Sequence, residues 1–549
     1  MKKLVLSGAL VFAFTLSSFA QTDANKPQLL EKVTVNPGEL NIPYEKWRLP
    51  NGLTVFIHED HSDPLVHVEV TYHVGSARES GGKSGFAHFF EHMMFQGSDN
   101  VADEEHFKIV QTAGGRMNGT TNHDRTNYFE TVPKNYLETA LWLEADRMGF
   151  LLDAVTQKKF ENQRATVKNE KDQNVTNRPY GMLDEVKNLT LYPDNHPYYW
   201  PTIGFVEDLN RVGVDDLKNF FMRWYGPNNA SIVVAGDVNP VEVMKMVEKY
   251  FGSIPRGPEV RKQKVEPVRL AEDKYANYGD KVYLPLLQFT FPTVPAYHPD
   301  EAALDMLGII MGGGNNSIFY KNFVKNEKAL QAFANHGVPF GNELAGEFSI
   351  GVLFFPDPDV KIEDMIRKTI DEFATVGVSD EDMARTRGLI ETGVMQQLQS
   401  VAGRASIISQ TYYTLGDRKW NVSDELARYK RVTKDDIMRV FNTYIKGKNA
   451  AIVNIFPRSL NAASNSDKAD TKLPETSGKV SSELEYKGLS YKKPVDNFDR
   501  SRKPDVGPAP APIVPGIYKD RIANGITVYG TTANEQPLVN LLFTIKGGN

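Results

Sequence analysis

The stretch RVGVDDLKNFFMRWYGPNNASIV, residues 211–233, returns in related form as RVTKDDIMRVFNTYIKGKNAAIV at residues 431–453, without a gap and at an offset of 220. Each copy predicts a helix with an acidic first turn, a loop that contains asparagine, and an apolar strand. Two unrelated amphipathic helices would not also match through loop and strand. The chain therefore contains two versions of one domain, which we place at residues 42–255 and 280–458.

A second repeat, at an offset of 473, relates NGLTVFIHEDHSDPLVHVEVTYHVG (51–75) to NGITVYGTTANEQPLVNLLFTIKGG (524–548). Both copies predict a β-hairpin, with a strand after Asn-Gly, a polar turn ending in proline and a second alternating strand. Residues 516–549 are thus expected to be the first hairpin of a third domain. We expect the sequence to be the N-terminal half of a longer polypeptide; the alternative is a natural end whose hairpin packs elsewhere.

These repeats predict an α+β fold made of two homologous domains, each a mostly antiparallel sheet packed with helices, plus the start of a third such domain. A chain of 549 residues is too long for a single core. Two stretches read as connectors: a charged linker at residues 256–279, and an extended linker at residues 459–515 that is rich in Ser, Lys and Pro.

The N-terminal residues have the pattern of a secretory signal. Lys2 and Lys3 precede a short apolar run that ends in small residues, which predicts a signal peptide at residues 1–20, cleaved after about Ala20, and an N-terminal extension at 21–41. Removal of the two lysines would change the net charge from −6 to −8. No other segment is long and apolar enough to span a membrane. We expect an exported protein, periplasmic or secreted.

Two whole-chain properties exclude further classes. The chain has no cysteine, which excludes a disulfide framework. The sequence pI is about 6.1 and the chain has no basic stripe, so we expect no nucleic-acid partner.

The segment GFAHFFEHMMF, residues 85–95, carries the clearest chemistry. It predicts a helix over about residues 84–95 that is apolar on almost every side, so its three polar side chains need a reason to be there. His88 and His92 are four residues apart and lie about 40° apart on one helical face, with Glu91 beside them. Two imidazoles can take two corners of a zinc tetrahedron, and a neighbouring glutamate can act as general base on a water. The pattern predicts a metal site.

A third ligand has to come from another segment. Residues 158–174 have helical character and bring Gln163, Val167 and Glu170 onto one face. Glu170 is the ligand we favour, but spacing alone leaves Glu161 and Glu185 as rivals.

With these residues in view, the chain resembles the pitrilysin, insulin-degrading enzyme and mitochondrial processing peptidase family, the inverzincin zinc metallopeptidases. The resemblance rests on HFFEH (88–92) within GSARESGGKSGFAHFFEHMMFQGS, and extends through GGRMNGTTNHDRTNYFETVP, NQRATVKNE, NRPYG, HPYYWPTIG and WYGPNNASIVVAGD. It covers essentially residues 42–458. The resemblance implies one Zn²⁺ in the catalytic first domain, held by His88, His92 and Glu170, with Glu91 as the base that activates water.

The resemblance also implies roles outside the ligand set. Gln163 stands where many family members have a second glutamate, and we expect a second-shell role for it, not a ligand role. The segment around Asn118 and Gly119 is expected to be an edge strand that binds an extended substrate, although its glycines could equally serve only to shape a hairpin. A missing C-terminal half or a partner subunit would close the chamber around the active site.

Together these features predict a zinc-dependent metalloendopeptidase that hydrolyses peptides or small unfolded proteins. The second domain lacks a counterpart of HxxEH and is expected to be non-catalytic. The competing interpretation is a non-catalytic, peptide-binding or structural subunit of a family heterodimer, and the intact motif argues against it.

Overall fold

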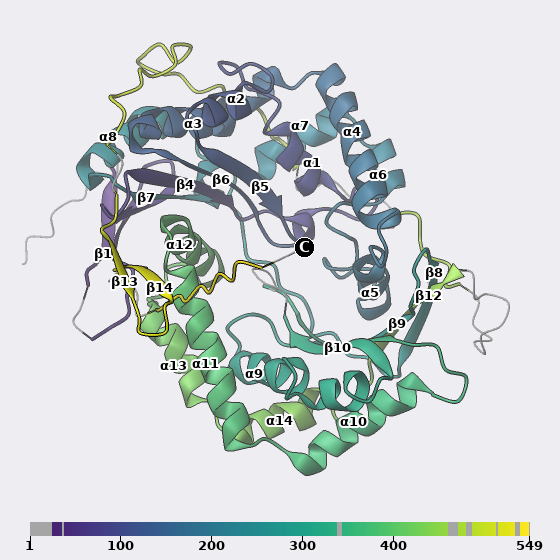
Figure 1. The fold of residues 1–549 in the computed structure, drawn as a ribbon. Helices are drawn as coiled ribbons and strands as arrows, with labels where there is room; N and C mark the ends of the chain where they lie inside the picture. Colours follow the sequence, from purple (N-terminus) through teal and green to yellow (C-terminus); the bar gives the residue numbers. More distant parts are fainter. Residues whose placement is uncertain are drawn as a thin grey trace, which may run out of the picture.

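The computed structural model describes residues 25–35, 38–337, 343–458, 470–478, 486–511, 514–532 and 538–547. The predicted signal peptide, residues 1–20, lies outside this range. The described residues form two sheet-and-helix halves that face each other (Figure 1). No helix among them is both long and apolar enough to cross a membrane.

The first half is built on a seven-stranded sheet in the order β1-β2-β3-β7-β4-β6-β5. All neighbouring strands are antiparallel except β3 and β7. β7 is the strand of the first repeat, and all seven of its residues are buried. The strands are β1 (Gln28–Val33), β2 (Tyr44–Arg48), β3 (Thr54–Glu59), β4 (Leu65–Tyr72), β5 (Arg116–Thr121), β6 (Thr126–Pro133) and β7 (Ala230–Gly236).

The second half repeats this pairing in a five-stranded sheet of order β10-β11-β9-β12-β8. Here β12 pairs in parallel with β8 and antiparallel with β9, as β7 does with β3 and β4. The prediction of two related, mostly antiparallel domains is therefore confirmed. The strands are β8 (Lys274–Asp280), β9 (Leu286–Thr293), β10 (Ala329–His336), β11 (Gly346–Phe354) and β12 (Ala451–Pro457).

Helices cover the outer face of each sheet (Figure 1). In the first half, apolar side chains of the sheet, α1, α3, α7 and α8 form one large core, and in the second half α9, α10 and α14 pack on their sheet in the same way. The helices of the first half are α1 (Phe86–Met93), α2 (Glu105–Thr112), α3 (Leu137–Ala154), α4 (Gln157–Lys171), α5 (Leu183–Leu191), α6 (Val206–Arg211), α7 (Val214–Trp224) and α8 (Pro240–Phe251). Those of the second half are α9 (Glu301–Gly312), α10 (Ile362–Val376), α11 (Asp380–Gln397), α12 (Val401–Leu415), α13 (Val422–Arg431) and α14 (Lys434–Tyr444).

The two halves exchange one helix each across their inner faces. α12 of the second half packs on β4 and β7 of the first sheet, and Thr71 Oγ1 lies 2.7 Å from Ser409 Oγ at this contact. Conversely, α5 of the first half packs on β8 and β12, through Val186 against Val453 and Ile455. Because each sheet completes its burial with a helix from the other half, the relative position of the halves is set by apolar cores.

Ile408→Ala tests this exchange. Ile408 of α12 is buried in the core that also contains Phe56 and Val233 of the first sheet. Truncating it removes apolar contacts and leaves a cavity, so we expect the free energy of unfolding to fall by about 2–4 kcal/mol. Urea unfolding measures this change. Leu389→Ala on α11 is the control, because this exposed side chain should change stability by less than about 0.5 kcal/mol; equal losses in the two variants would contradict the packing described here.

The hairpin predicted for residues 51–75 is wrong. Its two strands form as β3 and β4, but β7 lies between them and pairs with both. A sequence pattern of strand, turn and strand does not reveal a third strand inserted from 155 or more residues away, and the fully buried β7 needs neighbours on both sides.

The second copy of this pattern also differs from its prediction. There the hairpin is formed by β13 (Ile517–Arg521) and β14 (Thr527–Thr531) around Asn524-Gly525, and residues 538–547 are not a strand.

Two predicted domain boundaries are corrected by the observed strands. β1 falls within the extension assigned to residues 21–41, yet it pairs with β2 and extends the first sheet. All of β8 except its last residue falls within the linker assigned to residues 256–279, yet β8 is an edge strand of the second sheet. Both strands lie at sheet edges: β1 is exposed or half-buried throughout, and the buried residues of β8 include Asn277, Gly279 and Asp280, so neither strand has the strong apolar pattern of central strands.

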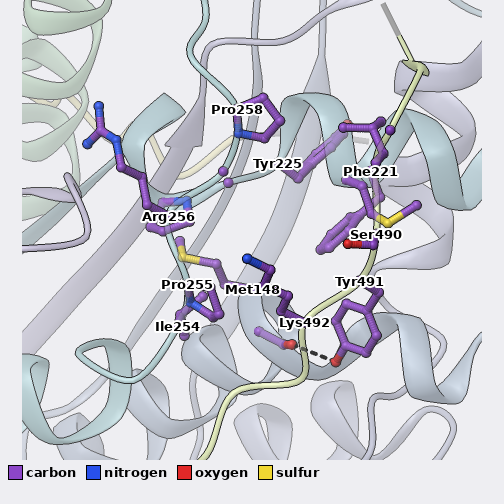
Figure 2. A pocket seen from close by; sticks show the side chains of 17 residues that line it. Met148, Phe221, Tyr225, Ile254, Pro255, Arg256, Pro258, Ser490, Tyr491 and Lys492 are labelled. Carbon is purple, nitrogen blue, oxygen red and sulfur yellow. Dashed lines mark hydrogen bonds between the residues drawn. The ribbon is translucent and has the colours of Figure 1, made fainter.

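The connector predicted at residues 459–515 is not extended away from the protein. Its described parts, residues 470–478 and 486–511, are called the strap below. The strap begins on the second half, where Thr471 N–H donates to the carbonyl of Asn277 in β8 at 2.9 Å, and from Thr476 onward it contacts the first half. Trp142 Nε1 donates to the carbonyl of Arg500 at 2.9 Å, and Tyr491 donates to the carbonyl of Gly149 at 3.0 Å. The strap also lines one side of an open cavity of about 290 Å³, together with Met148, Phe221 and other side chains (Figure 2). None of the predicted site residues lines this cavity.

Candidate metal centre

Helix α1 is fixed by aromatic packing on its buried side. The ring of Phe90 stacks on Phe221 of α7 at 5.6 Å, and Phe89 meets Phe160 of α4 at 5.1 Å. These contacts determine how α1 is rotated and leave His88 and His92 on its less buried side.

The start of α1 is fixed by backbone conformation and a carboxylate. Gly85 has a φ of 92°, and a Cβ there would lie 2.8 Å from the carbonyl oxygen of Ile203, so this position requires glycine. The Glu79 carboxylate accepts hydrogen bonds from the N–H groups of Gly85 and Ala87, both at 2.8 Å. It thereby satisfies donors at the N-terminus of the helix.

Glu170 comes to the histidines from the last turn of α4. Its Oε2 lies 3.0 Å from His92 Nε2 and 3.7 Å from His88 Nε2. One donor atom from each of the three side chains falls within 4.8 Å of the others. The structure therefore brings together the two histidines of the motif and the acid favoured as third ligand.

The two rival acids lie elsewhere. Glu161 is on the outer side of α4 and pairs with Arg164 at 2.9 Å. Glu185 is on α5 and forms a buried ion pair with Lys171 at 2.9 Å. Both carboxylates are therefore paired with cations of the chain. Of the three acids that the sequence spacing allowed, Glu170 is the one that lies beside the histidines.

The local electrostatics suit a cation between these groups. Burial, together with charge on His92, lowers the pKa of His88 to about 4, so its imidazole is neutral near pH 7. The hydrogen bond to His92 lowers the pKa of Glu170, against the effect of burial, so this carboxylate is charged. Two imidazoles and one carboxylate form the donor set of a catalytic zinc site, which leaves a position open for water or substrate.

Glu91 lies beside this set and faces the edge strand β5. Thr121 Oγ1 donates to Glu91 Oε2 at 2.7 Å, and burial raises the pKa of Glu91 despite that hydrogen bond. Gly119 lies on the same face of β5, and a Cβ there would stand 3.1 Å from Glu91 Cγ. Gly119 thus makes room for the base, a role separate from the substrate contact predicted for it.

The sequence interpretation missed two side chains that hold these carboxylates. Thr121 contacts Glu91, and Asn174, in the π-helical turn Asp172–Thr176 after α4, hydrogen-bonds to Glu170. The period-two alternation of β5 could have indicated Thr121, because it shares a face with Gly119. No pattern in the sequence signals the π-turn, which recurs at functional sites in proteins.

The remaining predicted residues have less defined positions. Gln163 is buried on α4, two turns before Glu170, and among the described residues its amide has no hydrogen bond to either histidine. Asn118 is exposed on β5, and its Oδ1 accepts from the N–H of Gly119 at 3.0 Å. β5 is an edge of the first sheet, as predicted.

A second buried group of possible ligands is explained without a metal. Among the described residues, His106, Glu130 and Glu144 also converge, with His106 Nε2 3.3 Å from Glu130 Oε2. Arg147 forms an ion pair with Glu144 and its guanidinium lies 4.3 Å from the Tyr128 ring centroid. The arginine supplies the positive charge that this core cluster needs.

Two family models match the chain. "Insulinase (Peptidase family M16)" matches residues 54–191, which contain all the candidate ligands, and "Peptidase M16 inactive domain" matches residues 211–389. The chain belongs to peptidase family M16. The family resemblance read from the HFFEH segment is thereby confirmed.

Curated relatives of this M16 member have peptidase names. The chain is 29% identical over 427 residues to "Zinc protease PqqE" of Helicobacter pylori, covering 75% of this chain and 93% of the relative. It is 26% identical over 422 residues to a probable mitochondrial-processing peptidase subunit beta of Arabidopsis thaliana, covering 74% of this chain and 77% of the relative.

Solved structures agree on the M16 fold. A protease from Helicobacter pylori superposes with a TM-score of 0.68 at 27% identity, covering 76% of this chain and 100% of the other. The first half of the periplasmic protease PqqL from Escherichia coli gives a TM-score of 0.62 at 17% identity, covering 77% and 93%. At that identity the second likeness supports the fold alone.

Proposed function

We propose that this M16 member is a zinc-dependent metalloendopeptidase that hydrolyses peptides or small unfolded proteins after export, in the periplasm or outside the cell. The convergence of His88, His92 and Glu170 within 4.8 Å, with Glu91 alongside, carries the proposal. The neutral imidazole of His88 and the charged carboxylate of Glu170 fit a zinc ion.

Held by His88, His92 and Glu170, a zinc ion would supply Lewis acidity that polarises the scissile carbonyl and lowers the pKa of a water. Glu91 accepts the proton of that water and passes it to the leaving amine. Thr121 donates to one oxygen of Glu91 at 2.7 Å, which orients the carboxylate and leaves its other oxygen to take the proton.

The substrate class follows from β5, an edge strand that packs against α1. An extended peptide could add to this edge through its main chain, a mode that reads chain shape more than side-chain identity. Asn118 is exposed there, and a bound peptide would compete for the Oδ1 contact that it makes with Gly119. A C-terminal half or a partner subunit that closes the chamber is part of the same proposal, on the basis of the family resemblance.

A chelation and reconstitution assay tests the function. The purified chain should cleave a fluorogenic peptide, lose activity with a chelator and regain it with one equivalent of Zn²⁺. Stoichiometric zinc without cleavage, even on a panel of unfolded peptides, would reject catalysis by this chain and favour the binding-subunit interpretation. Cleavage that survives complete metal removal would reject the zinc mechanism.

Thr121→Val should lower kcat by about ten-fold and leave zinc stoichiometry unchanged. Valine has a similar shape but removes the donor to Glu91, and a hydrogen bond to a charged group contributes about 1.5–3 kcal/mol. Thr120→Val is the matched control, because the neighbouring hydroxyl donates to Asn127 instead. Peptide kinetics on both variants measure the effect, and an equal loss in the two would refute the role of Thr121.

A further inference from the structure

Helices α1 and α4, which carry the candidate ligands, are both joined to the turn that precedes α6. Ser84 and Gly85 precede α1, and Gly204 and Phe205 precede α6. The N–H of Phe205 donates to Ser84 Oγ at 3.0 Å, and a Cβ on Gly204 would come within 2.5 Å of Gly85 Cα. The two backbones are therefore in direct contact, with no space for adjustment.

Helix α4 is joined to the same turn. Lys171, the residue after Glu170, donates from Nζ to the carbonyl of Gly204 at 2.7 Å. A shift of this turn would thus move the beginning of the His88 and His92 helix and the end of the Glu170 helix relative to each other.

Asp208 on α6 connects this turn to the strap. Its fully buried carboxylate accepts from the N–H of Ser84 at 3.1 Å and from Ser84 Oγ at 2.7 Å. The same carboxylate accepts from Ser477 N at 3.1 Å, from Ser477 Oγ and from Thr476 Oγ1. Burial alone would raise the pKa of Asp208, but the hydrogen bonds from Ser477, Thr476 and Ser84 outweigh it and lower the pKa, so the group is charged.

The Ser477 hydroxyl is used in both directions. It donates to Asp208 and accepts from the N–H of Gly82 at 2.7 Å, and the residue is 4% exposed. The strap has other anchors on the first half, through Tyr491 and Arg500. Attachment of the strap therefore does not depend on Ser477, which instead contacts Gly82, in the segment that leads into α1, and Asp208 of α6.

We propose that Ser477 is a positioning residue for the metal centre: through Asp208 and Gly82, the strap holds the 82–85 segment and thereby sets the spacing between the two histidines and Glu170. The inference rests on the proposed function for its metal. On this proposal the strap, which the sequence predicted to be only a connector, helps to hold the active site in place.

Ser477→Ala tests the inference by zinc binding and by amide hydrogen exchange. Zinc affinity is measured by competition with a chelator, with Zn²⁺ as the only added ligand. We expect the dissociation constant to rise about ten-fold, the lower end of the effect of residues that orient metal ligands. In the metal-free protein, amides of residues 84–94 should exchange faster than in the wild type, while those of α12 should not.

Two controls separate positioning from general loosening. Tyr491→Phe removes a strap anchor remote from Asp208, and Glu475→Ala changes an exposed strap residue two positions before Ser477. Both should bind zinc like the wild type. The inference is overturned if Ser477→Ala keeps wild-type affinity and exchange, or if Tyr491→Phe weakens zinc binding equally. A wild-type chain that binds zinc but cleaves nothing would reject the proposed function alone, since this comparison needs no turnover.

Discussion

Glu91→Gln is expected to lower peptide turnover by about 10³-fold while zinc remains bound at one equivalent per chain. Glutamine matches glutamate in shape and can still accept the hydrogen bond from Thr121, but it cannot take a proton from water. General base catalysis typically contributes about 10²–10⁴-fold to a rate, and the residual rate reflects the other groups of the site.

The measurement pairs kcat on a fluorogenic peptide with zinc content in the same sample. A lower kcat with intact zinc assigns Glu91 to proton transfer and not to metal binding. Unchanged hydrolysis by Glu91→Gln would contradict the mechanism, and loss of zinc would move Glu91 into the ligand set.

Glu170→Gln is expected to weaken zinc binding by more than about 100-fold, and to abolish hydrolysis at micromolar zinc. The change removes the charged ligand within reach of both histidines, and even residues that only orient ligands typically cost about 10–100-fold in affinity. Equilibrium competition with a chelator gives the dissociation constants.

The two rival acids are its matched controls. Glu161→Gln changes an exposed carboxylate on the same helix and should leave zinc affinity as in the wild type. Glu185→Gln should also retain zinc, but with lower thermal stability, because it leaves Lys171 buried without its ion-pair partner. Zinc loss in either control, with zinc retained by Glu170→Gln, would overturn the assignment of the third ligand.

The part of the site that lies on one helix was predictable from sequence. The spacing of His88, Glu91 and His92 defines their relative directions through helix geometry alone, and the observed α1 has that geometry. The sequence did not identify the third ligand in this way, because Glu161, Glu170 and Glu185 all lie at acceptable distances along the chain from the motif. Tertiary packing distinguishes them: Lys171 engages Glu185, whereas Glu170 faces the histidines.

The fold shows the same division between local and distant information. The duplicated helix, loop and strand correctly predicted two related domains, since each copy carries its own periodicity. The prediction of a hairpin at residues 51–75 was wrong because β7, from far along the chain, lies between β3 and β4. The exchange of α5 and α12 could not be predicted from the sequence of either domain alone. An apolar helix face shows that the helix is buried, but not which sheet it packs against.

The strap illustrates why composition can mislead. Residues 459–515 lack apolar periodicity and read as a free connector, yet the described parts make hydrogen bonds to buried groups such as Asp208 and Trp142. Those contacts use serine hydroxyls and backbone groups, which leave no periodic trace in a sequence.

The central claim is that His88, His92 and Glu170 hold one zinc ion. The most direct measurement is anomalous X-ray diffraction at the zinc absorption edge from crystals of the zinc-loaded wild-type chain. We expect a single strong peak in contact with His88 Nε2, His92 Nε2 and the Glu170 carboxylate. Stoichiometric zinc located elsewhere, at His106 and Glu130 for example, or no bound zinc in crystals grown with it, would contradict the account.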